Sequence, residues 1–304
     1  MGQTTLKGIH FLLTYICNYE CDHCFLYCSP RSTGTFTLKK MRNILGEAQK
    51  ISSVEWIFFE GGEPFLFYPL MVEGARLAKE KGFKLGIVTN SYWATTVEDA
   101  ELWLEPFVDI GIDDLSISND LFHYGNEEKN LAKNAEIAAH NLNLATSSIC
   151  IENPELQISL ENEHEKGTPI IGGGTMFRGR AIEKLTEGLP TQSWMNLTTC
   201  PHEDLEKLGR VHIDAFGNTQ ICQGLSIGNA CNTPLSELIN NYEVSKHPIC
   251  GPLFRGGPAE LSKEFNVPSE TSYVDECHYC FLVRKKLINK FPQFIGPRQI
   301  YGLE

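Results

Sequence analysis

Three cysteines stand close together in CNYECDHC, directly after the apolar run FLLTYI, and a fourth follows soon after. The spacing Cys17-x3-Cys21-x2-Cys24 is compatible with disulfides, with zinc or with an iron–sulfur cluster. Structural zinc sites use four ligands, typically in two separated pairs, and Cys28 or His23 could complete such a set. Three cysteines on an iron–sulfur cluster leave one iron open to another ligand. The spacing alone leaves zinc and iron–sulfur as alternatives.

The composition argues against a disulfide framework. The chain has 304 residues, eleven cysteines and a formal net charge of −12, and its start lacks a signal-peptide layout. No apolar stretch is long enough to cross a bilayer. We therefore expect a cytoplasmic protein, in which thiols stay reduced and clustered cysteines ligate metal or do chemistry. An acidic chain without a Lys/Arg stripe is also not expected to bind nucleic acid or membrane.

A second motif, EGGEP, closes the apolar run VEWIFFE (54–60). At the C-terminal end of a parallel strand, Gly61 and Gly62 would let the backbone approach a ligand closely, and Glu63 could hold an ammonium group. The motif alone is weak, because a tight strand–helix turn explains it equally well. Placed after a cysteine loop at the end of the preceding strand, it becomes a strong indication of a binding site.

Apolar runs alternate with helical patterns along the first 190 residues. Strands are predicted at 8–16, 54–60, 84–90, 114–118 and 144–151, with a sixth entering IIGGG at 170–174. Helices are predicted from a Thr37 cap to Ile51, up to Lys81 before a Gly82 stop, from Thr96 to Glu105, and over Glu127–Leu142. This alternation predicts parallel βα units whose functional loops follow the strand C-termini.

Together these motifs resemble the radical S-adenosylmethionine superfamily over roughly residues 8–190. The cysteine triplet corresponds to its cluster motif, and Gly61-Gly62-Glu63 to its methionine-binding segment. The resemblance implies an α/β fold with a partial (β/α)6 TIM-like barrel. It also implies cofactor contacts from the ends of the third and fourth strands, at Thr89, Asn90, Ser116, Ser118 and Asp120.

The chemistry implied by the resemblance is reductive cleavage of S-adenosylmethionine. The open iron of a 4Fe-4S cluster would chelate the amino and carboxylate groups of this cofactor. An electron from an external reductant, of the flavodoxin or ferredoxin type, would then release a 5′-deoxyadenosyl radical that takes hydrogen from a substrate. The glycines of IIGGGTMFRGRA (170–181) would approach the adenosine, and Arg178 and Arg180 are candidates for carboxylate contacts.

A second cysteine set follows where the strand–helix alternation ends. A hairpin is predicted over 211–222, turning at Phe216-Gly217-Asn218, and the set comprises Cys200, Cys222, Cys277 and Cys280. Structural zinc fits these spacings. Attached to this core, the set resembles the twitch form of the SPASM module, which carries one auxiliary 4Fe-4S cluster. We expect a core over 1–190, an auxiliary module over 191–285 and a docked tail over 286–304.

The stretch CNYECDHCFLYCSP is most similar to radical peptide epimerases and other peptide-modifying enzymes. In those epimerases a cysteine follows the auxiliary ligand and returns hydrogen to the substrate, whereas Gln223 follows Cys222 here. We therefore favour net oxidation or cross-linking of a ribosomally made peptide. The alternatives are a sugar or aminocyclitol dehydrogenase, an epimerase using Cys28 or Cys231 as donor, and a non-catalytic zinc or redox-sensing protein.

Overall fold

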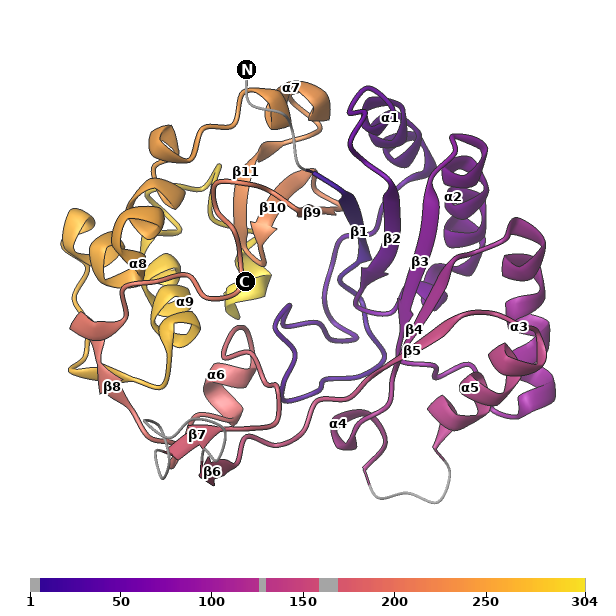
Figure 1. Ribbon diagram of the computed structural model, residues 1–304, viewed down its shortest axis with the longest axis horizontal. Helices are drawn as coiled ribbons and strands as arrows, with labels where there is room; N and C mark the ends of the chain where they lie inside the picture. Colours follow the sequence, from indigo (N-terminus) through magenta and orange to yellow (C-terminus); the bar gives the residue numbers. More distant parts are fainter. Residues whose placement is uncertain (1–5, 126–129, 159–168, 304) are drawn as a thin grey trace.

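The strand–helix alternation builds one continuous sheet in the computed structural model, which describes residues 6–125, 130–158 and 169–303 (Figure 1). The strands of this sheet are β1 (Gly8–Thr14), β2 (Trp56–Gly61), β3 (Lys84–Thr89), β4 (Asp114–Ser118), β5 (Thr146–Ile149), β9 (Arg210–Asp214), β10 (Asn218–Cys222) and β11 (Leu225–Asn229). Their order is β11-β10-β9-β1-β2-β3-β4-β5. The strands from β9 to β5 in this order run parallel, which confirms the predicted α/β class with a parallel sheet.

Helices cover one face of the parallel strands (Figure 1). The covering helices are α1 (Leu38–Ala48), α2 (Tyr68–Glu80), α3 (Val97–Ile110) and α5 (Leu131–Asn141), while the short helices η1 (Pro64–Phe67) and α4 (Leu121–Tyr124) follow the ends of β2 and β4. The predicted cap at Thr37 is confirmed, because its side chain accepts a hydrogen bond from the Lys40 amide. Thr96, where a helix was predicted to begin, accepts one from the Asp99 amide. The predicted start at Glu127 lies outside the described residues. Among the described residues, no helix is long and apolar enough to cross a membrane.

Alternation along the strands separates the core from the site. One face of β1 to β4 is fully buried under the helices, through Ile9, Phe11, Leu13, Ile57, Phe59, Leu85, Ile87, Leu115 and Ile117. Because successive side chains point to opposite faces, residues such as His10, Glu60 and Ser116 face the inside of the partial barrel. The helices therefore hold the sheet in place, and the inner face remains available for polar groups.

The sixth parallel strand is not where the sequence predicted it. The segment at 170–174 contributes only β7 (Pro169–Ile171), which pairs antiparallel with β6 (Leu156–Ile158) in a separate two-stranded sheet. Gly173 and Gly174 then take positive φ angles that end the strand. The parallel neighbour on the free side of β1 is β9 instead, which aligns His212 with His10. A strand from the C-terminal part of the chain thus completes the sheet.

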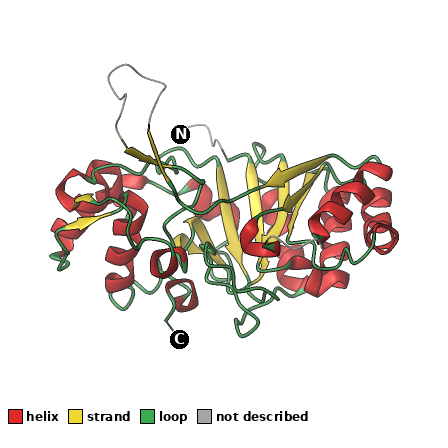
Figure 2. Ribbon diagram, turned by 90° about the horizontal axis from the view of Figure 1, so that it is seen from below, coloured by secondary structure: helices red, strands yellow, loops and turns green. Residues whose placement is uncertain are grey.

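The C-terminal part packs beside the barrel, on the left in Figure 1. Its elements, with those that lead into it, are α6 (Ala181–Lys184), β8 (Gln192–Ser193), η2 (Trp194–Asn196), α7 (Leu235–Asn240), η3 (Val244–Lys246), α8 (Cys250–Phe265), β12 (Ser272–Tyr273), α9 (Glu276–Leu287) and η4 (Arg298–Tyr301). Figure 2 shows helices on both sides of the central strands. The predicted hairpin is confirmed as β9 and β10, and Tyr301 in the tail is fully buried. Because the sheet continues past residue 190, the division into three parts remains a prediction.

A buried polar network joins the hairpin to β1. Asp214 accepts hydrogen bonds from the Tyr15 hydroxyl at 2.9 Å, from Gln220 at 3.0 Å and from Asn218 at 2.8 Å. The Gln220 side chain in turn accepts a hydrogen bond from the amide of Gly224. Since Tyr15 precedes the first cysteine loop and Gly224 follows Cys222, this network fixes the two cysteine sets relative to one another.

The two glycines after β2 let the cysteine loop pack directly on that strand. The Gly62 amide donates to the Thr14 carbonyl at 2.7 Å, and the Glu63 amide donates to the Ile16 carbonyl at 3.0 Å. A Cβ atom on Gly62 would lie 2.2 Å from the Ile16 oxygen, which is backbone and has little freedom to move. The glycines therefore allow the segment after β2 to pack closely against the backbone of residues 14–16.

Gly62→Ala should lower the free energy of unfolding by about 1–3 kcal/mol, the usual cost of overpacking, and should displace the loop that carries Cys17. Gly46→Ala in α1 is the matched control, because no atom lies within 4 Å of that position and alanine favours a helix. Urea denaturation and the iron content of anaerobically purified protein check both effects. Equal behaviour of the two variants would contradict this account.

Candidate active site

A cavity of about 370 Å³ opens at the C-terminal ends of the parallel strands. It brings together most of the predicted site residues, since its lining includes Cys17, Cys21, Cys24, Cys28, Gly61, Gly62, Thr89, Asn90 and Ser118. The remaining lining residues are largely aromatic or apolar, such as Tyr19, Phe25, Ile149 and Met176. Such a cavity has the size and the mixed lining of a small-molecule site.

Amide groups surround the thiols of the first cysteine loop. Cys17 Sγ accepts from the Tyr19 amide at 3.4 Å and from Asn90 Nδ2 at 3.6 Å, and Cys24 Sγ accepts from the Cys28 amide at 3.3 Å. Hydrogen bonds of this kind to cysteine sulfur tune iron–sulfur clusters. Burial raises the pKa of Cys17 to about 12, so binding of a metal there would release a proton.

A zinc ion would require three or four sulfur atoms of one cysteine set to lie closer together than they do in this structure. A tetrahedral zinc ion with Zn–S bonds of about 2.3 Å would hold its sulfur ligands about 3.8 Å apart. Within the described residues, which include all eleven cysteines, no three cysteine sulfurs lie within 4.8 Å of one another. An iron–sulfur cubane spreads its ligands further, because sulfide ions lie between the irons.

Glu63 has a structural role that the sequence did not predict. Its carboxylate is fully buried and accepts from the Asn90 amide at 2.7 Å, the Thr89 hydroxyl at 2.9 Å and the Phe65 amide at 3.0 Å. Burial raises the pKa of Glu63 to about 7, and these donors oppose that rise. Glu63 is not among the cavity-lining residues. It connects the ends of β2 and β3, and direct contact with an ammonium group remains a prediction.

The polar residues predicted at the fourth strand divide into two groups. Ser118 lines the cavity. Ser116 instead donates to Asp114 at 2.6 Å, and Asp120 caps α4 by accepting from the amides of Phe122 and His123. Ser116 and Asp120 therefore support the cavity wall, and their predicted contact with a cofactor remains a prediction.

Arg178 and Arg180 point to two different cysteine sets. Arg180 donates to the carbonyl groups of Cys21 at 2.8 Å and Cys28 at 2.7 Å and so holds the first loop. Arg178 is buried beside the second set, where its Nη2 lies 3.4 Å from Cys277 Sγ. Arg178 already contacts Gln223, Cys277 and Glu203, so its contact with the carboxylate of a cofactor remains a prediction.

The second cysteine set is assembled from three segments. Cys222 ends β10, Cys277 and Cys280 lie one turn apart on α9, and Cys200 comes from the loop before β9. Cys222 is near enough to each of the others for their thiolate charges to interact. Burial raises the pKa of both Cys200 and Cys277 to about 12. The four predicted ligands thus converge in the folded chain.

Three further residues inside the barrel were missed from the sequence. Glu60 lines the cavity and contacts His10 Nδ1 at 3.2 Å and His212 Nδ1 at 2.7 Å. They come from β2, β1 and β9, and only the pairing of these strands brings them together. Alternation along each strand was the one available signal, and it could not show that β9 lies beside β1.

The two candidate hydrogen donors lie in different surroundings. Cys28 is buried and lines the cavity, and a hydrogen bond from its side chain lowers the pKa of Cys24 to about 6. Cys231 is exposed in a surface groove of about 490 Å³ beside α1, and it is not among the cavity-lining residues. The role of each remains a prediction, and the geometry favours Cys28 over Cys231.

Glu63→Gln should destabilise the ligand-free protein by about 1–3 kcal/mol, because one of the two buried amides would then face an NH2 group. Chemical denaturation without S-adenosylmethionine measures this loss, and equilibrium dialysis measures the accompanying loss of affinity. Glu105→Gln on the exposed face of α3 serves as control. Unchanged stability with weakened binding would instead indicate that Glu63 contacts the ligand directly.

Comparisons with known proteins agree with the geometry of the first loop. The chain is 27% identical over 117 residues to YydG of Bacillus subtilis, whose name assigns it to peptide biosynthesis; this covers 38% of the chain and 37% of YydG. It is 27% identical over 165 residues to an S-adenosylmethionine-dependent nucleotide dehydratase of Psychrobacter lutiphocae, which covers 50% of the chain and 54% of that protein. The matched part thus spans about a third to a half of these curated relatives.

The fold is also similar to that of a solved structure. BtrN in complex with AdoMet and 2-DOIA matches with a TM-score of 0.53 and 15% identity, over 79% of this chain and 84% of BtrN. The family model of the radical SAM superfamily matches residues 11–140, which include the cysteine loop, the two glycines and the ends of β3 and β4. Residues 11–140 of the chain therefore match a radical SAM domain.

Proposed function

We propose that the cavity holds a 4Fe-4S cluster on Cys17, Cys21 and Cys24 together with S-adenosylmethionine. The observation that carries this proposal is the convergence of three thiols, the backbone of Gly61 and Gly62, and the end of β3 on one cavity. When bound, the cluster supplies the electron that cleaves S-adenosylmethionine to a 5′-deoxyadenosyl radical, which removes a hydrogen atom from the substrate.

The residues of the chain position these groups and exclude water. Asn90 contacts the Cys17 sulfur and, through its backbone, the Glu63 carboxylate, so it connects the cluster loop to the glycine segment. Arg180 fixes the opposite end of the loop. The apolar side chains of Phe25, Ile149 and Met176 close the cavity, which protects a radical from quenching.

The second cysteine set is proposed to hold an auxiliary 4Fe-4S cluster. Four thiols from three segments supply a complete ligand set. Their sulfur atoms are not grouped as a zinc tetrahedron requires, because no three lie within 4.8 Å of one another in the described residues. With four protein ligands, such a cluster has no open iron and suits electron transfer.

A ribosomally made peptide is the proposed substrate class. The similarity to YydG, with its name in peptide biosynthesis, supports this choice. The cavity lies at the small end of the range for ligand sites, so a cofactor would occupy most of it. The alternative is a small-molecule substrate, such as a nucleotide, a sugar or an aminocyclitol, and the longer match to a nucleotide dehydratase supports it.

Net oxidation is the proposed outcome. After loss of one hydrogen atom, the substrate would give one electron to the auxiliary cluster and one proton to a base. Gln223 cannot return hydrogen, since it has no thiol. The proton is proposed to pass to the group of Glu60, His10 and His212, since Glu60 lines the cavity and contacts both imidazoles. The two imidazoles keep the pKa of Glu60 below its usual range despite burial, so an imidazole of this group is a better acceptor than the carboxylate.

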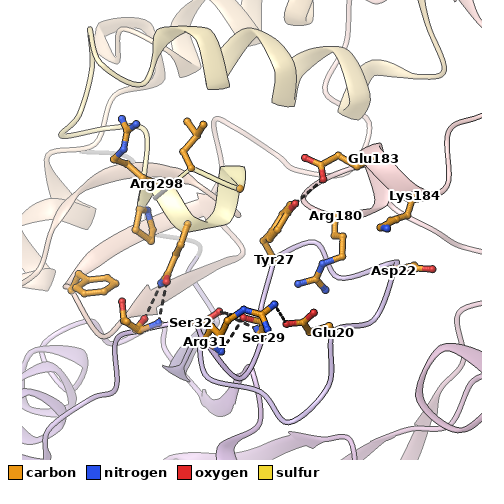
Figure 3. Close-up of a pocket in the computed structure, with 16 residues that line it drawn as sticks. Glu20, Asp22, Tyr27, Ser29, Arg31, Ser32, Arg180, Glu183, Lys184 and Arg298 are labelled. Carbon is orange, nitrogen blue, oxygen red and sulfur yellow. Dashed lines mark hydrogen bonds and ion pairs between the residues drawn. The ribbon is translucent and has the colours of Figure 1, made fainter.

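A groove of about 1100 Å³ on the other side of the cysteine loop is proposed to receive the external reductant (Figure 3). Loop residues Glu20 and Asp22 line this groove, whereas the neighbouring cysteines line the cavity. Its lining carries four cations, Arg31, Arg180, Lys184 and Arg298, and three carboxylates, Glu20, Asp22 and Glu183. In a chain of net charge −12 this near-neutral groove would repel an acidic one-electron carrier of the flavodoxin or ferredoxin type less than the rest of the surface does.

Anaerobically purified protein should contain about eight irons and little zinc, and with dithionite and S-adenosylmethionine it should form 5′-deoxyadenosine and methionine. Replacing Cys17, Cys21 and Cys24 together by Ala should remove half of the iron and abolish this cleavage. Elemental analysis and chromatography of the products measure both. Stoichiometric zinc that survives in the triple variant would show that the second set is a zinc site.

Substrate turnover in D2O should give a product lighter by two hydrogens. Candidate peptides and small molecules are first screened for a substrate-dependent rise in 5′-deoxyadenosine, and mass spectrometry then reports the product. A product of unchanged composition that carries one solvent deuterium would indicate epimerisation, and Cys28→Ala would then be the variant that tests the donor.

A further inference from the structure

Two buried arginines flank the second cysteine set. Arg178 is 2% exposed and Arg284 is 1% exposed. Arg178 Nη2 lies 3.4 Å from Cys277 Sγ, and Arg284 Nη2 lies 3.9 Å from Cys222 Sγ. A guanidinium stays charged in a protein, and burying one is costly unless negative charge compensates it. Two such groups beside four thiols therefore indicate a site that carries net negative charge when it is filled.

Gln223 holds both arginines in place. Its side-chain Oε1 accepts from Arg178 Nη1 at 2.6 Å, and its backbone carbonyl accepts from Arg284 Nη1 at 2.9 Å. Arg284 also donates to the Tyr301 hydroxyl at 3.0 Å, and the Arg178 guanidinium lies 3.6 Å from the Glu203 carboxylate. Glu203 offsets part of the charge of Arg178, whereas the Arg284 partners are neutral. Gln223, the residue after Cys222, thus positions both arginines through its hydrogen bonds.

We propose that Arg178, Arg284 and Gln223 form a cationic clamp that raises the reduction potential of the auxiliary cluster. This inference rests on the proposed function, in which the second set binds a 4Fe-4S cluster. Adding one electron to a cluster adds one negative charge, and nearby buried cations favour that reduced form. The clamp makes this cluster an acceptor for the single electron that the substrate radical loses, while the proton leaves to a base and a one-electron carrier later reoxidises the cluster.

The position of Arg284 on α9 supports its role beside the second cysteine set. Cys277, Cys280 and Arg284 follow one another at spacings of three and four residues, so they lie on one face of this helix. Arg178 reaches the set from the segment that also carries Arg180, which holds the first cysteine loop. One residue of the clamp, Arg178, therefore comes from the segment that also holds the first cysteine loop.

The test is an EPR-monitored redox titration of the full chain in which Cys17, Cys21 and Cys24 are replaced by Ala, so that only the auxiliary cluster is observed. Adding Arg178→Gln should lower the equilibrium constant for one-electron reduction at least tenfold, a shift of about 59 mV toward negative potential. Arg178→Lys keeps the charge and should change the constant less than threefold. Arg255→Gln removes an exposed charge of the same region and should have no effect.

Iron and zinc analysis precedes the titration, so a zinc-filled second site would overturn the proposed cluster independently of the clamp. With the cluster present, an unchanged potential in Arg178→Gln would overturn the clamp. If Arg178→Gln fails to retain iron, the potential is measured in Gln223→Ala instead. This variant removes the side-chain oxygen that accepts from Arg178 and keeps the backbone carbonyl that accepts from Arg284. We expect a smaller shift in the same direction, and no shift would overturn the proposal.

Discussion

The contact between the backbone of Gly61-Gly62 and the backbone of residues 14–16 is the constraint on which the site depends. Hydrogen bonds between these segments extend the pairing of β1 and β2 beyond the strands themselves. The cysteine loop begins at Cys17, one residue after this contact. Glu63 follows the glycines directly, and its carboxylate accepts hydrogen bonds from Thr89 and Asn90 at the end of β3. A side chain at Gly62 would separate the two segments, so the cysteine loop and the cavity wall both depend on the absence of a Cβ atom there.

Local signals in the sequence predicted the first half of the fold well, and most of the residues predicted for the first site line one cavity. The caps at Thr37 and Thr96 act on amides three residues away, and the cysteine spacing is confined to one loop. A cap and a cysteine spacing each involve only a few consecutive residues, so they can be identified without knowing the distant partners of the segment. The sequence also identified the glycine pair. Gly61 and Gly62 line the cavity as predicted, and they also pack against the backbone of residues 12–16, which was not predicted.

Features that depend on distant pairing were predicted poorly. The sixth strand was placed at 170–174 because an apolar pair precedes glycines there, yet that segment pairs with β6 and the place beside β1 is taken by β9. The group of His10, Glu60 and His212 follows from that pairing and could not be seen without it. Arg178, predicted to contact the cofactor, lies beside Cys277 of the second cysteine set. The sequence could not show this contact, because the two residues are far apart along the chain.

The place of β9 in the sheet has a consequence for how this chain could be divided. A fragment ending near residue 190 would contain every residue of the matched domain, but it would leave β1 as an edge strand whose amides and carbonyls on the β9 side are unpaired. Exposed edge strands are sites of intermolecular pairing, and β1 is both long and apolar. The C-terminal hairpin therefore protects the strand that leads into the first cysteine loop from self-association, whatever metal its own cysteines bind.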